Sequence, residues 1–188
     1  MRQFKVWLAS AGLLGMMLVP TLRADQWNEK TKVTFDEPVE IPGAVLPAGT
    51  YIFKLLGSET DRNIVEIWSA HETELDATVL AVPDERLHPT GKTVIKFAER
   101  RSDSPAALKA WFYPGDTYGL KFVYPHDEAL ELAKANKESV FSTRSDLKPY
   151  VKEKMKSDQD VDAKKMKSAL VKEVSPSGEE KVIPSSKK

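Results

Sequence analysis

The chain contains no cysteine, and this absence excludes several structures and activities. Without thiols there is no disulfide, no cysteine nucleophile, and no cysteine-ligated zinc or iron–sulfur site. A chain of 188 residues must then hold its fold by packing alone. An excess of one charge is also lacking, because Lys plus Arg number 28 and Asp plus Glu number 28. Net charge therefore gives no reason to expect a nucleic-acid partner or an anionic membrane.

Motifs for catalysis and for cofactors are equally scarce. The three histidines, His71, His88 and His126, lack the spacing of metal ligands. No nucleophile elbow, phosphate-binding glycine loop or dinucleotide fingerprint is present. The sequence predicts no metal and no cofactor. A carboxylate pair keeps a hydrolase open as an alternative, and its candidates are Asp84, Glu85, Glu99 and Asp103.

The one extended hydrophobic run lies at the N-terminus. Arg2 and Lys5 precede an apolar stretch from residue 6 to residue 19, and Pro20 and Ala24 follow it. The run is shorter than the roughly 20 residues that a membrane span needs. We expect residues 1–24 to be a signal peptide cleaved after Ala24, with a retained anchor as the alternative. The mature protein is then periplasmic or secreted, without stable membrane insertion.

Residues 25–125 have the pattern of an all-β domain. Short runs rich in Val, Ile, Thr and aromatic residues alternate with Gly, Pro and Asp or Asn. We expect one β-sandwich, or a partly open barrel, of about seven or eight short antiparallel strands. The predicted strands cover residues 31–36, 38–42, 50–56, 62–69, 74–82, 92–98, 107–113 and 119–124.

Two polar segments between these strands predict turns rather than sites. Leu46-Pro47-Ala48-Gly49-Thr50 looks like a scrambled cell-wall anchoring signal, but its order is reversed and it lies in the middle of the domain. Together with Pro42-Gly43 it folds the chain back twice before the next strand. His71-Glu72 is expected to be a hairpin turn and not a metal pair.

The composition changes after Pro125. Asp127 and Glu128 suit a helix start, and Lys134 and Lys137 suit its end, which predicts an amphipathic helix over residues 127–138 within a segment 126–143 packed on the sandwich. Residues 144–188 carry 12 basic and 8 acidic side chains, whereas residues 25–125 carry 11 basic and 16 acidic. We expect a disordered, flexible basic tail. A second helix near 160–173 is expected only on binding.

An aromatic cluster near residue 111 is the candidate binding surface. Strand alternation puts Leu108, Ala110 and Phe112 on one face and Lys109, Trp111 and Tyr113 on the other. Trp111 and Tyr113, with Asp116 and Tyr118 in the following turn, would then bind a sugar ring or a partner strand. The alternative is that Trp111 and Tyr113 are buried, because large aromatic residues usually are.

Several segments together resemble a family of small exported all-β bacterial proteins with no assigned function. The resemblance covers about residues 25–140 and rests on residues 46–51, 61–65, 77–84, 89–95 and 107–116. The chain departs from the family at His71-Glu72, where Asp-Gly is common, and at Leu120-Lys121, where a more polar pair is common. The resemblance implies an exported β-domain and implies no activity and no catalytic residue.

These patterns favour an exported, non-enzymatic β-sandwich that binds an envelope protein or a glycan. Export, the strand pattern, the missing catalytic motifs and the basic tail support this interpretation. One alternative is a hydrolase acting on envelope carbohydrate or peptide through an acidic cleft. The other is a structural scaffold protein with no ligand, which sequence spacing does not distinguish from a binding module.

Overall fold

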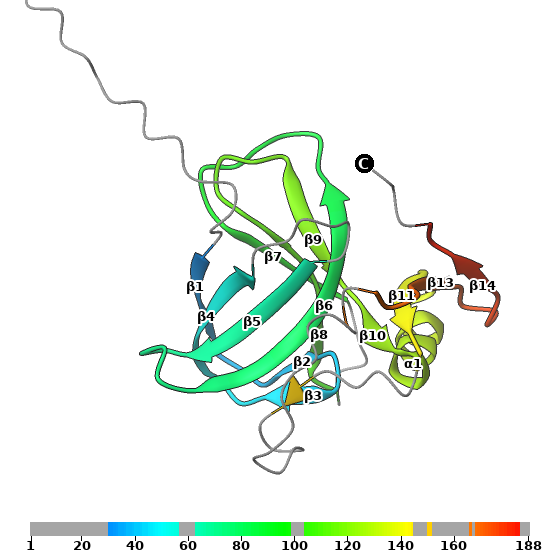
Figure 1. Ribbon diagram of the computed structural model, residues 1–188, viewed down its shortest axis with the longest axis horizontal. Coiled ribbons are helices and arrows are strands. Elements are labelled where there is room, and N and C mark those ends of the chain that lie inside the picture. Colours follow the sequence, from blue (N-terminus) through cyan, green and yellow to red (C-terminus); the bar gives the residue numbers. More distant parts are fainter. Residues whose placement is uncertain are drawn as a thin grey trace, which may run out of the picture.

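The computed structural model describes residues 30–56, 63–98, 104–144, 150–151, 166 and 168–184. The predicted signal peptide, residues 1–24, lies outside this part of the chain. Figure 1 shows one large curved sheet with a helix and several short strands gathered at one side of it. Within the described residues no helix has the length and apolar character to cross a membrane.

The large sheet has ten strands and is almost entirely antiparallel. Its order is β1-β4-β5-β6-β9-β8-β2-β3, with β12 beside β6 and β7 beside β8, and only β2 and β8 run parallel. The strands are β1 (Lys30–Phe35), β2 (Val39–Ile41), β3 (Ala44–Leu46), β4 (Gly49–Leu56), β5 (Asn63–Ser69), β6 (Leu75–Glu85), β7 (Val94–Ala98), β8 (Ala106–Phe112), β9 (Tyr118–Phe122) and β12 (Tyr150–Val151).

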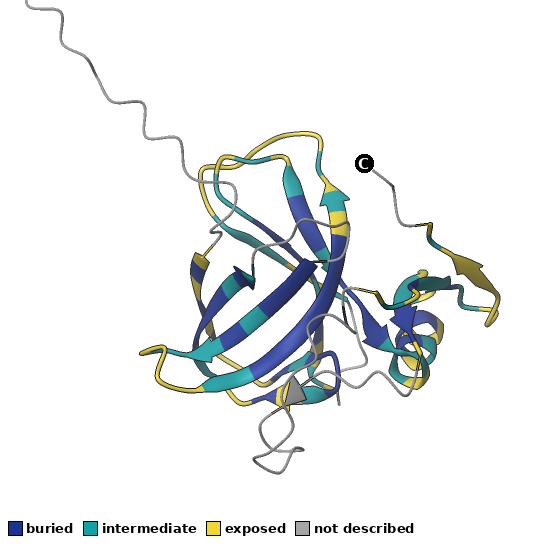
Figure 2. Cartoon of the chain, in the orientation of Figure 1, coloured by how far each residue is buried: buried dark blue, intermediate teal, exposed yellow. Residues whose placement is uncertain are grey.

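The sheet bends around one main core. The ring of Phe53 in β4 meets Trp111 in β8 edge-on at 5.9 Å between ring centroids, and Phe35 in β1 meets Phe97 in β7 at 6.1 Å. Strands distant in the sheet order therefore face one another, as the layers of a sandwich do. The predicted all-β architecture is confirmed, and Figure 2 shows the buried residues concentrated in its central strands.

Alternation explains how the first strand forms. In β1 the residues are alternately exposed and buried, so that Val33 and Phe35 face the core while Lys32 and Thr34 face solvent. All eight predicted strands are present near their expected positions, and β3 is an additional one. It arises because Val45 and its neighbours, bracketed by two turns, pair with β2.

Both predicted turns are confirmed. Gly43, with φ of 84°, joins β2 to β3, a left-handed conformation that glycine adopts without strain. The Tyr51 hydroxyl donates a hydrogen bond of 2.9 Å to the Pro47 carbonyl, which holds the corner before β4. Between β5 and β6, the Glu72 amide donates to the Ser69 carbonyl at 2.9 Å, and Glu72 has φ of 55°.

The predicted faces of β8 are wrong at one end, because the strand contains a bulge. Lys96 pairs with Ala110 but the next residue, Phe97, pairs with Leu108, so Lys109 has no register partner in β7. An extra residue reverses the alternation beyond it. Leu108 and Trp111 therefore both belong to the main core.

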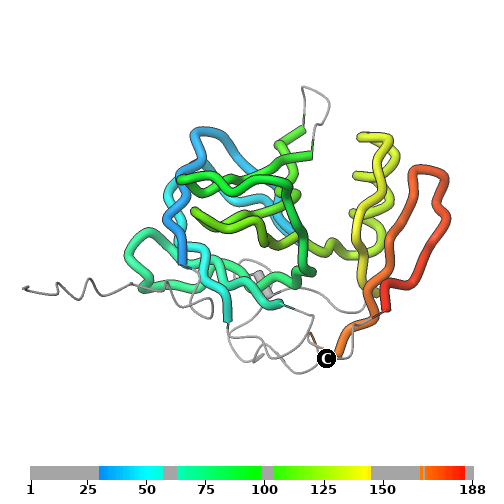
Figure 3. The backbone as a smooth tube through the Cα atoms, turned by 90° about the horizontal axis from the view of Figure 1, so that it is seen from above, coloured from blue at the N-terminus to red at the C-terminus, as the bar shows by residue number. Residues whose placement is uncertain are grey.

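A helix and a second sheet follow the sandwich. Helix α1 spans His126–Asn136, which confirms the predicted helix, and it buries Ala129, Leu132 and Ala133. The second sheet has the order β10-β11-β13-β14. Its strands are β10 (Tyr124–Pro125), β11 (Val140–Thr143), β13 (Lys172–Val174) and β14 (Glu180–Val182). Figure 3 shows α1 and this sheet together beside the sandwich.

The prediction of a disordered tail is wrong for residues 168–184. Its strands β13 and β14 form a hairpin, and β13 pairs with β11. Met166 and Val171 join a second core, which also contains Ile64, Leu80, Val82 and Val123. The helix near 160–173 was expected only on binding and stays a prediction; in the free chain Lys172 begins β13, and residues 160–165 lie outside the described chain. Strands β5 and β6 are apolar on both faces, so this hairpin covers surface that the sandwich alone leaves open.

Candidate functional site

Trp111, the centre of the predicted aromatic surface, lies in the main core. Its side chain is 1% exposed and packs against Phe53. The alternative of burial therefore holds for Trp111, and its ring is not available to a sugar or a partner strand. The physical reason is the bulge at Lys109, which keeps Trp111 on the inner face together with Leu108.

Tyr113, Asp116 and Tyr118 are half-buried; the first two lie in the turn between β8 and β9, and Tyr118 begins β9. The Asp116 carboxylate accepts a hydrogen bond of 2.9 Å from the Tyr118 amide, which is the usual role of Asp in such a turn. Arg86 donates to the carbonyl oxygens of Tyr113 at 3.1 Å and Asp116 at 2.9 Å. Asn63 donates to the Tyr118 hydroxyl at 3.4 Å. These contacts order the turn and leave no aromatic platform around Trp111.

The predicted carboxylate candidates do not form a described pair. Asp84 makes an ion pair of 3.1 Å with Lys121, and Glu85 is exposed at the end of β6. Glu99 and Asp103 lie outside the described residues. In the part of the chain that the structure places, no three His, Asp or Glu side chains gather where a metal ion would bind.

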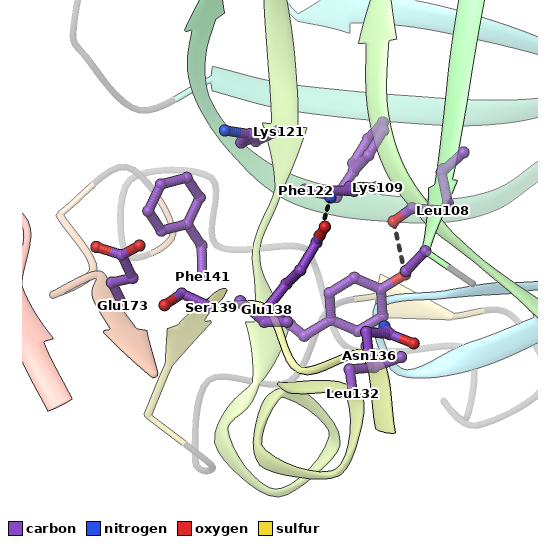
Figure 4. Close-up of a pocket in the computed structure, with 13 residues that line it drawn as sticks. Leu108, Lys109, Lys121, Phe122, Leu132, Asn136, Glu138, Ser139, Phe141 and Glu173 are labelled. Carbon is purple, nitrogen blue, oxygen red and sulfur yellow. Dashed lines mark hydrogen bonds and ion pairs between the residues drawn. The ribbon is translucent and has the colours of Figure 1, made fainter. Parts of the chain in front are cut away.

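A cavity of about 360 Å³ lies where the sandwich meets α1 and the second sheet. We call it the junction cavity. Its volume is within the range of small-molecule sites, about 300–1,000 Å³. Its apolar walls come from both parts of the molecule, as Figure 4 shows for Leu108 and Phe122 from the sandwich and for Leu132 and Phe141 from α1 and β11. Val140 of β11 also lines the cavity.

An ion pair crosses from one wall of the cavity to the other. Lys109, re-aimed by the bulge in β8, contacts the Glu138 carboxylate just beyond α1 (Figure 4). The hydrogen bond from Lys109, followed by its charge, lowers the pKa of Glu138 below its ordinary value. Lys121 lies next to them, is paired with Asp84, and places its ammonium 5.7 Å from the centre of the Phe141 ring. Both lysines that line the cavity therefore already have carboxylate partners.

Asn136 is the unusual polar residue of this cavity. It lies at the last position of α1 among the residues that line the cavity, and its amide nitrogen and oxygen are buried and find no hydrogen-bond partner among the residues that the structure describes. An unsatisfied buried polar group costs about 1–3 kcal/mol. The neighbouring Tyr124 differs, because its hydroxyl donates to the Leu108 carbonyl at 2.7 Å.

Sequence reasoning did not find this cavity. Its residues come from β7, β8, β9, β10, α1, β11 and β13 and from the segment after α1, and no spacing rule brings these segments together. One sequence signal was available: Ile64-Val65 and Leu80-Ala81-Val82 are apolar at consecutive positions, which indicates strands covered on both faces. That pattern predicts a second layer, although it does not say which segment supplies it.

The fold and the cavity together define a class of protein: an all-β sandwich joined to a small helix-and-sheet unit, with a ligand-sized cavity between them. No protein-family model, curated protein or solved structure matches the chain.

Proposed function

We propose that this protein is an exported, non-catalytic binding module of the bacterial envelope that holds a small ligand in the junction cavity. The N-terminal residues 1–24 support export, since their pattern is that of a signal peptide. The lack of a catalytic motif in the sequence supports a binding role. Export and the all-β fold also support membership of the family of small exported all-β proteins that the sequence resembles.

The observation that carries the proposal is the composition of the junction cavity. It combines apolar walls with polar side chains that could orient a ligand, and these are Lys109, Lys121, Asn136, Glu138, Ser139 and Glu173. Such a cavity between two packing units is also a common position for ligands, because each unit contributes one wall.

A hydrolase is the less favoured alternative. Two carboxylates, Glu138 and Glu173, line the cavity, but glycoside hydrolysis needs one carboxyl group whose pKa is raised so that it remains a proton donor. Lys109 has the opposite effect, because it lowers the pKa of Glu138. Glu138 is thereby held in its ionised form and suits an ion pair rather than general acid catalysis.

Ligand capture with a cavity-filled variant tests the proposal. Mature protein, residues 25–188, is immobilised, exposed to an extract of envelope metabolites, and its bound small molecules are identified by mass spectrometry. Ala98→Phe adds a ring at a cavity-lining position, and Leu87→Phe, at a residue 91% exposed and away from the cavity, is the matched control.

We expect a compound enriched on the wild type and on Leu87→Phe but lost from Ala98→Phe. Circular dichroism establishes that each variant is folded, and Ser139→Trp at the exposed rim provides a second block. Equal retention by all variants contradicts the cavity as the site. If nothing is retained by any of them, the scaffold alternative replaces the proposal, and turnover of a captured compound supports the hydrolase instead.

A further inference from the structure

The large sheet ends in two edge strands, β1 and β7, whose aromatic side chains meet. Among the described residues β1 pairs only with β4, and β7 pairs only with β8. The rings of Phe35 in β1 and Phe97 in β7 lie 6.1 Å apart between centroids. The outer edges of both strands therefore present backbone N–H and C=O groups that no described strand pairs.

The two edge strands run in the same direction, so they cannot close the sheet as one more antiparallel pair. From one edge to the other the order is β7-β8-β9-β6-β5-β4-β1, and every neighbouring pair in it is antiparallel. An even number of antiparallel steps leaves β1 and β7 parallel to each other. One further strand between them, antiparallel to both, continues the pattern without a break.

A pocket of about 410 Å³ lies near the C-terminal ends of these two strands. We call it the edge pocket, and its lining includes Phe35, Pro38, Phe97 and Ala106. Phe97 is 40% exposed, and every residue of β7 is at least partly exposed. Lysine often protects an apolar edge, but the Lys96 ammonium lies 4.7 Å from the centre of the Phe112 ring. An apolar, uncovered edge of this kind is the usual surface to which an extended chain adds itself.

The charges along β1 change sign from one end of the strand to the other. Lys30 and Lys32 lie at its start. Asp36 and Glu37 follow its end, line the edge pocket and are exposed. Neither carboxylate makes an ion pair with a described residue. A strand antiparallel to β1 begins beside the carboxylates and ends beside the lysines, so basic residues suit its first end and acidic residues its last.

We infer that the gap between β1 and β7 is a docking site for an extended segment of a partner protein, which adds itself as a strand antiparallel to both edges. The segment carries Lys or Arg at its N-terminal end, next to Asp36 and Glu37. Apolar side chains at alternate positions pack on Phe35 and Phe97. Hydrogen bonds from the main chain hold the segment, and the charges set its direction. The edge pocket shares no lining residue with the junction cavity, so this inference does not rest on the proposed function.

Two other occupants fit the gap less well. Residues 25–29 precede Lys30 directly, and a tight return turn takes two of these five residues, which leaves too few to pair along β1. A second folded copy presents the edge of a whole sheet, whereas the contact between Phe35 and Phe97 leaves room for a single strand at most.

The test uses the peptide acetyl-Lys-Val-Thr-Val-Thr-Val-Glu-amide and the full mature chain, with binding measured by calorimetry. We expect saturable binding, and slower hydrogen exchange of amides in β1 and β7 on addition of the peptide. The charge-swapped peptide, with Glu first and Lys last, should bind at least about threefold more weakly at low salt. A peptide with N-methyl groups on alternate residues loses main-chain donors and should bind at least about tenfold more weakly.

Two variants locate the site on the protein. Phe97→Lys places a charge on the edge, and we expect peptide binding at least about tenfold weaker. Val45→Lys, at a residue 44% exposed in the edge strand β3, is the matched control and should keep wild-type affinity. The double variant Asp36→Asn with Glu37→Gln changes two exposed side chains outside the strands, and it should bind both peptides with equal affinity. Circular dichroism establishes that each variant is folded.

Several results overturn the inference. It is wrong if wild-type protein binds neither peptide, or if Phe97→Lys and Val45→Lys bind the first peptide equally well. Tighter binding of the charge-swapped peptide contradicts the antiparallel direction. If sedimentation shows that the mature chain is a dimer and that Phe97→Lys is a monomer, a second copy and not a partner segment occupies the edge.

Discussion

The sandwich and the C-terminal hairpin are held in place by different means. The sandwich has long strands whose buried residues form one large main core, in which Phe53 and Trp111 are fully buried aromatic side chains. The hairpin has strands of three residues, and all residues of β14 are exposed. It is attached by a few apolar contacts, chiefly Met166 and Val171 in the second core. A short polar segment can thus be part of a fold when it covers an apolar face that another unit leaves open.

The hairpin covers an apolar face of the sandwich and also supports one wall of the junction cavity. It covers the second apolar face of β5 and β6, where Ile64, Leu80 and Val82 lie. Through β13 it also supports β11, which provides Val140 and Phe141 to the junction cavity. The sandwich therefore depends on the hairpin for one covered face and for one wall of the cavity.

The largest expected effect comes from removing the hairpin. A chain that ends after Val151 keeps β12, loses Met166, Val171 and both hairpin strands, and exposes Ile64, Leu80 and Val82, each of which gains about 1.5–3 kcal/mol from burial. We expect the free energy of unfolding in urea to fall by several kcal/mol. A chain that ends after Pro184 keeps β13 and β14 and is the control. Equal urea midpoints for the two shortened chains would show that the sandwich is independent of the hairpin.

A smaller loss is expected from a change inside the sandwich. In Gly119→Ala the new Cβ lies 2.3 Å from Cδ1 of the fully buried Phe112 ring. The ring has little space to move, because Arg86 and Lys96 lie 5.0 and 4.7 Å from its centre. We expect a loss of roughly 1–3 kcal/mol in chemical denaturation. Gly91→Ala, where the added Cβ meets nothing within 4 Å, should change little, and a similar loss in both variants would contradict this packing.

A smaller side chain at Val171, just before β13, measures how much the second core contributes to stability. Val171 is fully buried in the second core, whereas Val182 in β14 is 51% exposed. We expect Val171→Ala to cost roughly 2 kcal/mol, from two lost methyl groups and the space that they leave, and Val182→Ala to cost much less. Thermal unfolding of the two variants measures the difference. Identical melting temperatures would mean that the second core contributes no stability.

The smallest effect concerns the ion pair that crosses the cavity. Lys109 lowers the folded-state pKa of Glu138, so the pair stabilises the protein above the unfolded pKa of Glu138 and this stability is lost as pH falls through the lowered folded pKa. The pair is partly exposed, and its contribution is on the order of 0.2–1 kcal/mol. We expect Lys109→Met to raise the pKa of Glu138 in an NMR titration. An unchanged pKa in Lys109→Met would show that the pair does not form in solution.

The strands of the sandwich could be predicted from the sequence, but the surroundings of Trp111 and the junction cavity could not. Alternation in residues such as Lys32 and Val33, together with Pro and Gly at the turns, predicted eight strands because each pattern is local. The bulge at Lys109 was missed because an inserted residue has no marker in the strand's composition. That error moved Trp111 to the wrong face.

The hairpin and the junction cavity were missed for a related reason. Residues 172–184 are mostly charged or small, and only the packing of Val171 before them against Ile64 and Leu80 makes this segment part of the fold. The cavity depends on where seven separate elements meet, which no local pattern in the sequence specifies.

Hydrogen exchange of the C-terminal amides tests the central claim most directly, namely that the hairpin is a packed part of the fold. In the structure the Ile183 amide donates to the Val171 carbonyl at 3.0 Å, and β13 is paired with β11 on one side and β14 on the other. In mature wild-type protein, exchange followed by mass spectrometry or NMR should show protected amides in residues 172–174 and at Ile183. Exchange of these amides at the rate of an unfolded chain, while β5 and β6 stay protected, would contradict the account.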